Sequence, residues 1–181
     1  DAEVIGFLDN YTVMVLTNGA APLLAGARVE TKRRADIVQV GDGLLGRVFD
    51  GAGHELDGLG APHLPDNWPL RGERVNPLRR KPVRETLDVG VRALNGLVTV
   101  GRGQKIGIIA GSGVGKSSLL SCIARYTEAE VVIIGLIGER GREVSGFVEE
   151  LSASPSFGHT CVVAVPADQS PVLRLRGLHR T

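Results

Sequence analysis

The feature that most constrains this chain is a glycine-rich stretch at residues 110–117, with the sequence Ala-Gly-Ser-Gly-Val-Gly-Lys-Ser. An apolar run at 106–110 predicts a buried strand directly before it, and residues 116–126 predict a helix directly after it. A strand, a glycine loop and a helix in this order bind phosphate through backbone N–H groups and the helix N-terminus. The stretch therefore predicts an α/β fold built around a phosphate-binding loop.

Each residue type in this loop has a chemical reason to be there. The glycines let the backbone curl so that successive N–H groups point at a triphosphate. Lys116 is placed to bridge the β- and γ-phosphates of ATP, and Ser117 to offer its hydroxyl to Mg²⁺. Ala110 stands where the usual motif has its first glycine, a difference of one methyl group. The predicted nucleotide-binding residues are Ala110, Gly111, Ser112, Gly113, Val114, Gly115, Lys116, Ser117 and Ser118, with Ser117 as the metal ligand.

From residue 85 onward, apolar runs of strand length alternate with segments of helical periodicity. Such alternation predicts a parallel sheet with helices on both faces. Within the predicted helix at 116–126, we expect Leu119, Leu120, Ile123 and Ala124 to share one face. The predicted helix at 143–151 is expected to bury Val144, Phe147, Val148 and Leu151. In chain order, the predicted elements are a helix at 91–96 ending at a glycine, a strand at 106–110, a helix at 116–126, a strand at 131–137, a helix at 143–151 and a strand at 161–165.

A second motif, Gly-Glu-Arg-Gly-Arg-Glu-Val at residues 138–144, follows the predicted strand at 131–137. Ligands bind beyond the carboxyl ends of parallel strands, so this turn and the phosphate loop are expected to face one crevice. Glu139 is placed to polarise a water that attacks the γ-phosphate, and Arg140 or Arg142 to hold phosphate charge. From the residues alone, Glu139 equally suits a helix N-terminal acid or an ion-pair partner.

A nucleoside triphosphatase also needs an acidic residue directly after an apolar strand, where it holds Mg²⁺ through water. Asp168 comes closest, but Pro166 and Ala167 separate it from the predicted strand at 161–165. We therefore expect Asp168 to begin a loop, and the nucleotide site to be incomplete within these residues.

The first half of the chain has a different character. Short apolar segments at 4–8, 12–16, 27–31, 37–40 and 44–49, separated by turn residues, predict a small antiparallel barrel or sheet. Residues 51–84 hold five of the nine prolines, which predicts an extended linker. Its last third is basic, and either solvation or contact with phosphates or an acidic partner accounts for that charge. The predicted division is a partial N-terminal barrel at 1–50, a linker at 51–84 and an ATP-binding domain at 85–181.

Composition sets the outer limits. With 43% hydrophobic and 23% charged residues the chain is globular. Its net charge of +1 gives no electrostatic reason to expect a nucleic-acid partner. No apolar run approaches the ~20 residues of a membrane span. The four histidines show no ligand spacing, and the two cysteines, Cys122 and Cys161, are predicted to be free thiols.

Residues 101–117 and 134–144 together resemble the type III secretion and flagellar export ATPases, relatives of the catalytic subunits of rotary ATP synthases. The similarity extends through 43–51 and 166–177. This resemblance implies part of a small N-terminal β-barrel at 1–50. After the linker it implies an incomplete RecA-like P-loop NTPase core, with residues 85–181 as the first half of the ATP-binding domain. It also implies catalytic roles for Lys116, for Glu139 as the water-polarising glutamate and for Arg140 as a phosphate-contacting arginine.

The resemblance implies an ATPase that binds ATP and Mg²⁺ and energises protein export through a virulence or flagellar system. Such proteins form homohexamers with nucleotide between subunits. They lie in the cytoplasm, peripheral to the inner face of the bacterial membrane, with export apparatus proteins and chaperone–substrate complexes as partners. The family's start of the barrel, magnesium-associated aspartate, interfacial arginine and C-terminal helical domain are not found, so we expect a fragment without turnover on its own.

Three other functions stay open from the sequence. The first is a nucleotide-binding remnant that docks on partners without hydrolysis, and the second is a subunit of a proton-translocating ATP synthase. The third, a hexameric RNA translocase, is disfavoured because the chain lacks a basic, aromatic nucleic-acid surface.

Overall fold

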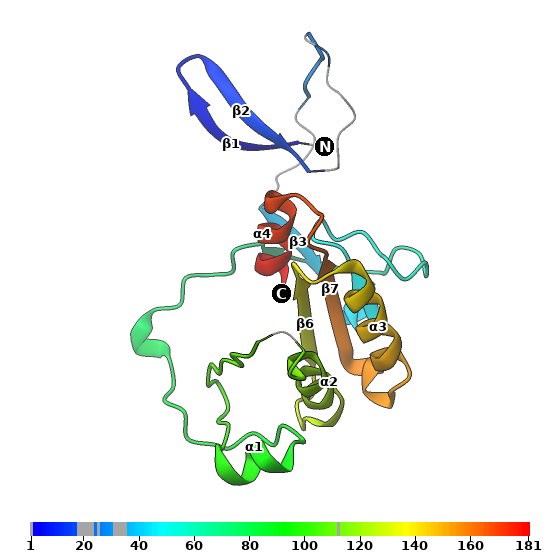
Figure 1. Cartoon of the computed structure of the whole chain (residues 1–181). Helices are drawn as coiled ribbons and strands as arrows, with labels where there is room; N and C mark the ends of the chain where they lie inside the picture. The colour runs from blue at the N-terminus through cyan, green and yellow to red at the C-terminus, as the bar shows by residue number, and fades with distance from the viewer. Residues whose placement is uncertain (1, 18–23, 25, 31–35, 112) are drawn as a thin grey trace.

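A computed structural model describes residues 2–17, 24, 26–30, 36–111 and 113–181. At its centre is a parallel sheet of three strands in the order β4-β7-β6 (Figure 1). These strands are β4 (Arg47–Phe49), β7 (Thr160–Val165) and β6 (Val132–Ile137). Every residue of the middle strand β7 is buried. The mixed α/β architecture with a parallel sheet is thus confirmed.

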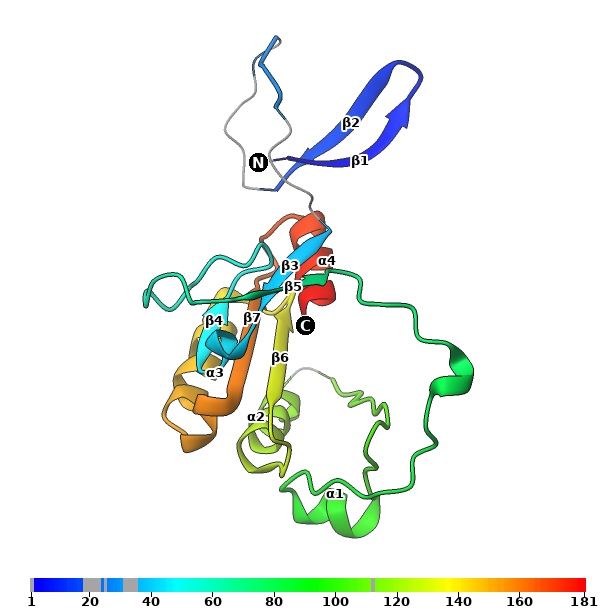
Figure 2. The same cartoon turned by 180° about the vertical axis from the view of Figure 1, so that it is seen from behind.

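Helices cover both faces of this sheet, as predicted. Helices α2 (Lys116–Tyr126) and α3 (Gly141–Ser152) lie on one face and α4 (Pro171–Arg180) on the other (Figures 1 and 2). Successive side chains of a strand point to opposite faces. Val162 and Ala164 accordingly pack with α2 and α3, while Val163 and Val165 pack with α4. The two sides of β7 therefore supply both halves of the core.

The predicted helices at 116–126 and 143–151 are confirmed, and the second begins two residues earlier. Phe147 and Leu151 of α3 are buried, with Val144 and Val148 packed beside them. In α2, Ala124 is buried as predicted, and Leu119 and Ile123 are half-buried. The prediction is wrong for Leu120, which is 41% exposed, and it missed the buried Ser121. The helix at 91–96 is found as α1 (Arg92–Leu97), and Gly96 lies inside it instead of ending it. The described residues also form three short 3₁₀ helices: η1 (Asp42–Leu44), η2 (Pro77–Arg79) and η3 (Pro155–His159).

The predicted strand at 106–110 is wrong. Residues 104–111 have no regular structure, and Ile109 is 100% exposed. A strand needs a neighbour that completes its backbone hydrogen bonds. The middle strand β7 already pairs on both sides, and within the described residues no strand pairs with 106–110. The segment instead lies with α1 in a long excursion that stands away from the sheet (Figure 2).

The strands of the first half are arranged differently from the prediction. The hairpin of β1 (Ala2–Leu8) and β2 (Tyr11–Leu16) is confirmed. Strand β3 (Ile37–Val40) is also found, and it pairs antiparallel with β5 (Asp66–Pro69), which comes from the predicted linker. The predicted strand at 44–49 shortens to β4 because η1 occupies its beginning. Residues 27–30 are exposed without regular structure, so that predicted strand is wrong, and its last residue, Thr31, lies outside the described residues.

The described strands of residues 1–50 do not form one antiparallel sheet. They fall into two separate two-stranded sheets and the parallel sheet, which β4 joins. Two strand pairings, β4 with β7 and β5 with β3, therefore cross the predicted limits at residues 50 and 84. The division into barrel, linker and ATP-binding domain remains a prediction.

Residues 71–84 are exposed and extended apart from η2, as expected of a proline-rich linker. No ion pair joins its basic side chains to any residue in the described part of the chain, which leaves both interpretations of its charge open. None of the described helices is both long and apolar enough to span a bilayer. Those basic residues are Arg71, Arg74, Arg79, Arg80, Lys81 and Arg84.

Candidate functional site

The glycine loop leads directly into α2, and two of its glycines have backbone conformations that require glycine. Gly113 has φ +77° and Gly115, the N-cap of α2, has φ +95°. Residues other than glycine rarely adopt these left-handed φ values. Gly111 is not in this conformation, and Ser112 lies outside the described residues. At these two glycines the backbone turns sharply, directly before α2 begins at Lys116.

The backbone of this loop is open to a ligand. Apart from adjacent chain, no atom of the described residues lies within 4 Å of the position that a Cβ would take at Gly111, Gly113 or Gly115. The N–H groups of the first turn of α2 have no carbonyl partner inside the helix, and the helix dipole adds partial positive charge there. This end of α2 carries no side-chain cap that would occupy those donors. Free donors, positive potential and open space together fit a phosphate group.

The structure brings Lys116 and Glu139 together from two different elements. Lys116 is the first residue of α2, and Glu139 lies in the turn after β6. The Lys116 Nζ atom is 3.3 Å from Glu139 Oε1, and the two side chains are 41% and 33% exposed. Glu139 is therefore an ion-pair partner, one of the roles its sequence position allows, and it lies at the mouth of the phosphate loop.

The turn that carries Glu139 is fastened to the end of β7. Gly138, with φ +79°, donates its backbone N–H to the Val165 carbonyl at 2.8 Å. The Ala167 N–H donates to the Glu139 carbonyl at 3.0 Å. These two bonds fasten the turn to the end of β7, and the Lys116–Glu139 pair places it beside the start of α2. The expected proximity of the turn and the loop is found.

Among the described residues, the other predicted charged residues form no ion pair with Lys116 or Glu139. The guanidinium of Arg140 is 3.9 Å from Glu143 on its own helix, and its side chain is 71% exposed. Arg142 is exposed as well. Asp168 lies exposed in the turn between β7 and α4, where a loop was expected. A phosphate contact by Arg140 therefore stays a prediction.

The residues of the loop fit a magnesium ion that arrives with a nucleotide. Among the described residues no group of three or more His, Cys, Asp or Glu side chains could hold a metal ion. Mg²⁺ keeps several waters and is usually bound by substrate phosphates with only one or two protein oxygens. Ser117 presents an exposed hydroxyl in the first turn of α2, which suits this limited role.

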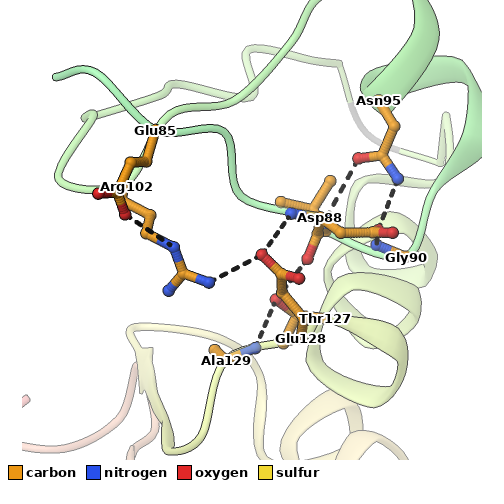
Figure 3. A network of polar contacts seen from close by, with 9 residues as sticks. Glu85, Asp88, Gly90, Asn95, Arg102, Thr127, Glu128 and Ala129 are labelled. Carbon is orange, nitrogen blue, oxygen red and sulfur yellow. Dashed lines mark hydrogen bonds and ion pairs between the residues drawn. The ribbon is translucent and has the colours of Figure 1, made fainter.

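A polar network at the other end of α2 was not predicted (Figure 3). The Glu128 carboxylate accepts from Arg102 Nη2 at 2.9 Å and from the Asp88 N–H at 3.2 Å. The Asp88 carboxylate accepts from the Gly90 N–H at 2.7 Å and from Asn95 Nδ2 at 2.6 Å. These donors hold the pKa of Asp88 below its usual range. Nothing periodic marks these residues in the sequence, since the two contacts of the Glu128 carboxylate join positions 26 and 40 apart.

A cavity of about 310 Å³ lies on the other face of the sheet, between β3 and η1 on one side and β6, β7 and Arg180 on the other. Neither Lys116 nor Glu139 is among its lining residues. The thiol of Cys161 borders it, and burial raises the pKa of that thiol. Both cysteines are free, as predicted. The cavity and the phosphate loop are therefore separate features.

Comparison with known proteins identifies the class. Residues 90–180, half of the chain, match the ATP synthase alpha/beta family, nucleotide-binding domain. This chain belongs to that family.

Two individual relatives are similar to nearly the whole of this chain. The chain is 46% identical to the flagellum-specific ATP synthase of Pseudomonas aeruginosa, over 97% of this chain and 39% of that protein. It is 43% identical to the type 3 secretion system ATPase of Sinorhizobium fredii, over 96% of this chain and 39% of that protein. The chain therefore spans about 40% of the length of these relatives.

A solved structure agrees with this similarity. The ATPase EscN, from the type III secretion system of enteropathogenic E. coli and in complex with its central stalk EscO, matches 98% of this chain and 44% of its own. The TM-score is 0.89 at 35% identity.

Proposed function

We propose that this chain is the nucleotide-binding part of an ATPase that energises protein export through a type III system, flagellar or virulence-associated. The observation that carries the proposal is the Lys116–Glu139 pair, 3.3 Å apart at the open N-terminus of α2. Its support is the family match and relatives named as flagellum-specific ATP synthase and type 3 secretion system ATPase.

In this proposal the loop holds the phosphates of ATP. The N–H groups around Gly113 and Gly115 and the first turn of α2 donate to phosphate oxygens, and Lys116 adds a full positive charge. Ser117 is the protein ligand of Mg²⁺, which neutralises charge on the phosphates when bound. To reach the phosphates Lys116 gives up part of its contact with Glu139, so the ion pair holds the lysine in place until a nucleotide binds.

Glu139 is proposed to act on the attacking water. Its carboxylate is 33% exposed and tethered through the backbone bonds of Gly138 and Ala167, so it is both accessible to water and fixed in place. A carboxylate in such a position orients a water and accepts its proton. Arg140 is proposed to turn from Glu143 toward the phosphate, which its high exposure permits.

The proposed assembly is a homohexamer with nucleotide between subunits, in the cytoplasm and peripheral to the inner face of the bacterial membrane. Proposed partners are export apparatus proteins and chaperone–substrate complexes. The support is the similarity to EscN, which was solved assembled and with its central stalk EscO. Hydrolysis is proposed to belong to that assembly.

Calorimetric titration of the chain with MgATP tests the binding site. Lys116→Ala should weaken binding at least about tenfold, because a charge-assisted contact to phosphate is lost. Lys105→Ala is the matched control, since Lys105 is an exposed lysine that we place outside the site, and it should bind as wild type. Equal affinities for wild type and Lys116→Ala would contradict the assignment.

Glu139→Gln separates binding from chemistry in the same titration. It removes the negative charge beside Lys116 and should leave MgATP affinity equal or tighter, while lowering kcat in an assembled ATPase. A tenfold loss of affinity in Glu139→Gln would show that Glu139 supports binding and not the attacking water.

A further inference from the structure

We infer that Glu128 is a positioning residue for the phosphate loop, because it fastens the chain that enters the loop to the end of the helix that leaves it. This inference rests on the proposed nucleotide site and names a residue that does not touch it. The juxtaposition is visible in Figure 3, where Arg102 and Asp88 converge on Glu128.

Glu128 joins three segments by contacts on both its carboxylate and its backbone. The carboxylate accepts from Arg102 at 2.9 Å and from the Asp88 N–H at 3.2 Å. The Glu128 N–H in turn donates to the Asp88 carbonyl at 3.0 Å, and the Thr127 hydroxyl donates to the same carbonyl at 3.1 Å. Three segments therefore meet at the Glu128 carboxylate: the segment around Asp88, the turn at Arg102 and the C-terminal end of α2.

The segment around Asp88 has little freedom to move. Gly90 has φ +72°, and a Cβ there would collide with the backbone and Cβ of Tyr126. Asn95 of α1 donates to the Asp88 carboxylate and accepts from the Val89 N–H at 3.2 Å. The turn at Arg102 is bound to the same region, because the Arg102 N–H donates to the Glu85 carbonyl at 2.8 Å. Glu128 thus connects α2 to a platform that is already ordered.

The approach to the loop depends on this connection. The last backbone bond before the loop is the Gln104 N–H to the Gly101 carbonyl at 3.0 Å. From 105 to 111 the described chain makes no further backbone hydrogen bond, and it is largely exposed. The turn at 101–104 is therefore the last point at which a described backbone hydrogen bond fixes the chain before the loop. Arg102 is the residue of that turn that reaches α2, through Glu128.

The contacts are suited to positioning more than to stability. The Arg102 and Glu128 side chains are 51% and 46% exposed, and ion pairs that face solvent contribute little to the free energy of folding. A small displacement of the loop, in contrast, changes the geometry of every N–H that meets a phosphate. We therefore expect nucleotide affinity to respond to Glu128 more than thermal stability does.

The test compares Glu128→Gln with Glu130→Gln in the full chain. Glu130 is exposed, two residues away, and has no ion pair with a described residue, so it controls for the loss of one negative charge near the end of α2. In MgATP titrations, Glu128→Gln should weaken binding roughly 3–10-fold and Glu130→Gln should not. The melting temperatures of the two variants should agree closely.

A charge exchange tests the ion pair itself. Arg102→Glu and Glu128→Arg should each weaken binding, and the double variant should recover part of the loss because the pair is restored with its charges reversed. Additive losses in the double variant, or equal affinities for Glu128→Gln and wild type, would overturn the inference.

A second readout needs no nucleotide. Trypsin should cleave after the exposed Lys105 faster in Glu128→Gln than in Glu130→Gln, because the approach segment is then held less firmly. Equal cleavage rates would also count against the inference. If Lys116→Ala binds MgATP as wild type while Lys105 cleavage still responds to Glu128, the proposed nucleotide site fails and the anchoring stands. If Lys116→Ala abolishes binding and Glu128→Gln changes neither readout, only the positioning role fails.

Discussion

Two apolar segments of similar composition have opposite environments in this molecule. Strand β7 (Thr160–Val165) is buried throughout, with Val162 at 0% and Val163 at 2% exposure. Residues 106–110 read from the sequence as the same kind of buried strand, yet Ile109 is 100% exposed. The difference is not in the residues themselves, since both runs consist mainly of small and branched apolar side chains.

The difference lies in the neighbours. β7 has a hydrogen-bonded strand on each side and a helix layer on each face. Residues 106–110 have neither within the described part of the chain. An apolar run thus indicates that burial is favourable, while a strand also requires partners for its backbone groups. The variants below test this contrast between the sheet and the excursion.

The largest effect is expected at the centre of the sheet region. Leu151 of α3 is 0% exposed and packs with Val162 and Ala164. Leu151→Ala removes buried hydrocarbon and leaves a cavity, so it should lower the free energy of unfolding by about 2–5 kcal/mol. Urea denaturation followed by circular dichroism measures this.

Val163→Ala, on the opposite face of β7, keeps that prediction testable if Leu151→Ala fails to fold. It removes less hydrocarbon, and it should also destabilise. A loss below about 0.5 kcal/mol in both variants would show that this sheet is not the stable core.

A smaller effect is expected where polar contacts hold the edge strand β4. Arg47 of β4 contacts Asp57 through Nε at 2.7 Å and Nη2 at 2.9 Å, and both side chains are nearly buried, at 12% and 13% exposure. Hydrogen bonding to Arg47 holds the pKa of Asp57 well below its usual range. Asp57→Asn at pH 7 should cost about 1–3 kcal/mol, because a charged acceptor is lost from an almost buried pair.

The sign of the pH dependence follows from that lowered pKa. The Asp57 carboxyl binds its proton more weakly in the folded than in the unfolded chain. Its contribution to the free energy of unfolding is therefore fully present above the unfolded pKa of about 4 and is lost as the pH falls below that value. The gap in stability between wild type and Asp57→Asn should therefore narrow from pH 7 to pH 3. Asp66→Asn, at an exposed position on β5, should show no such gap. A gap that stays constant with pH would contradict the lowered pKa.

The sequence predicts best those elements whose residues repeat with the period of their structure. Helix α2 is found at the predicted residues, and α3 and β7 within two residues. In α3 the predicted apolar positions Phe147 and Leu151 are the buried ones. β5 was missed because its residues, Asp-Asn-Trp-Pro, carry no apolar alternation and include a proline.

The site divides in the same way. The glycine loop and the start of α2 were predictable because two of the loop's glycines, Gly113 and Gly115, adopt the positive φ that favours glycine. The proximity of Lys116 and Glu139 was predicted from parallel strands that end at one edge of a sheet, yet it occurs without a strand at 106–110 and thus for another reason. The Glu128 network could not be predicted, because it depends on how residues far apart in the sequence come together. The roles of Glu139 and Arg140 in catalysis remain predictions.

The smallest expected effect gives the sharpest test of the contrast. Ile109→Ala removes about as much hydrocarbon as Leu151→Ala, yet Ile109 is 100% exposed and should lose no packing. Substitutions at such exposed positions usually change stability by less than about 0.5 kcal/mol. Urea denaturation of Ile109→Ala beside Leu151→Ala compares the two under the same conditions. A cost above about 1 kcal/mol for Ile109→Ala would mean that 106–110 is buried in solution and that the segment finds a partner after all.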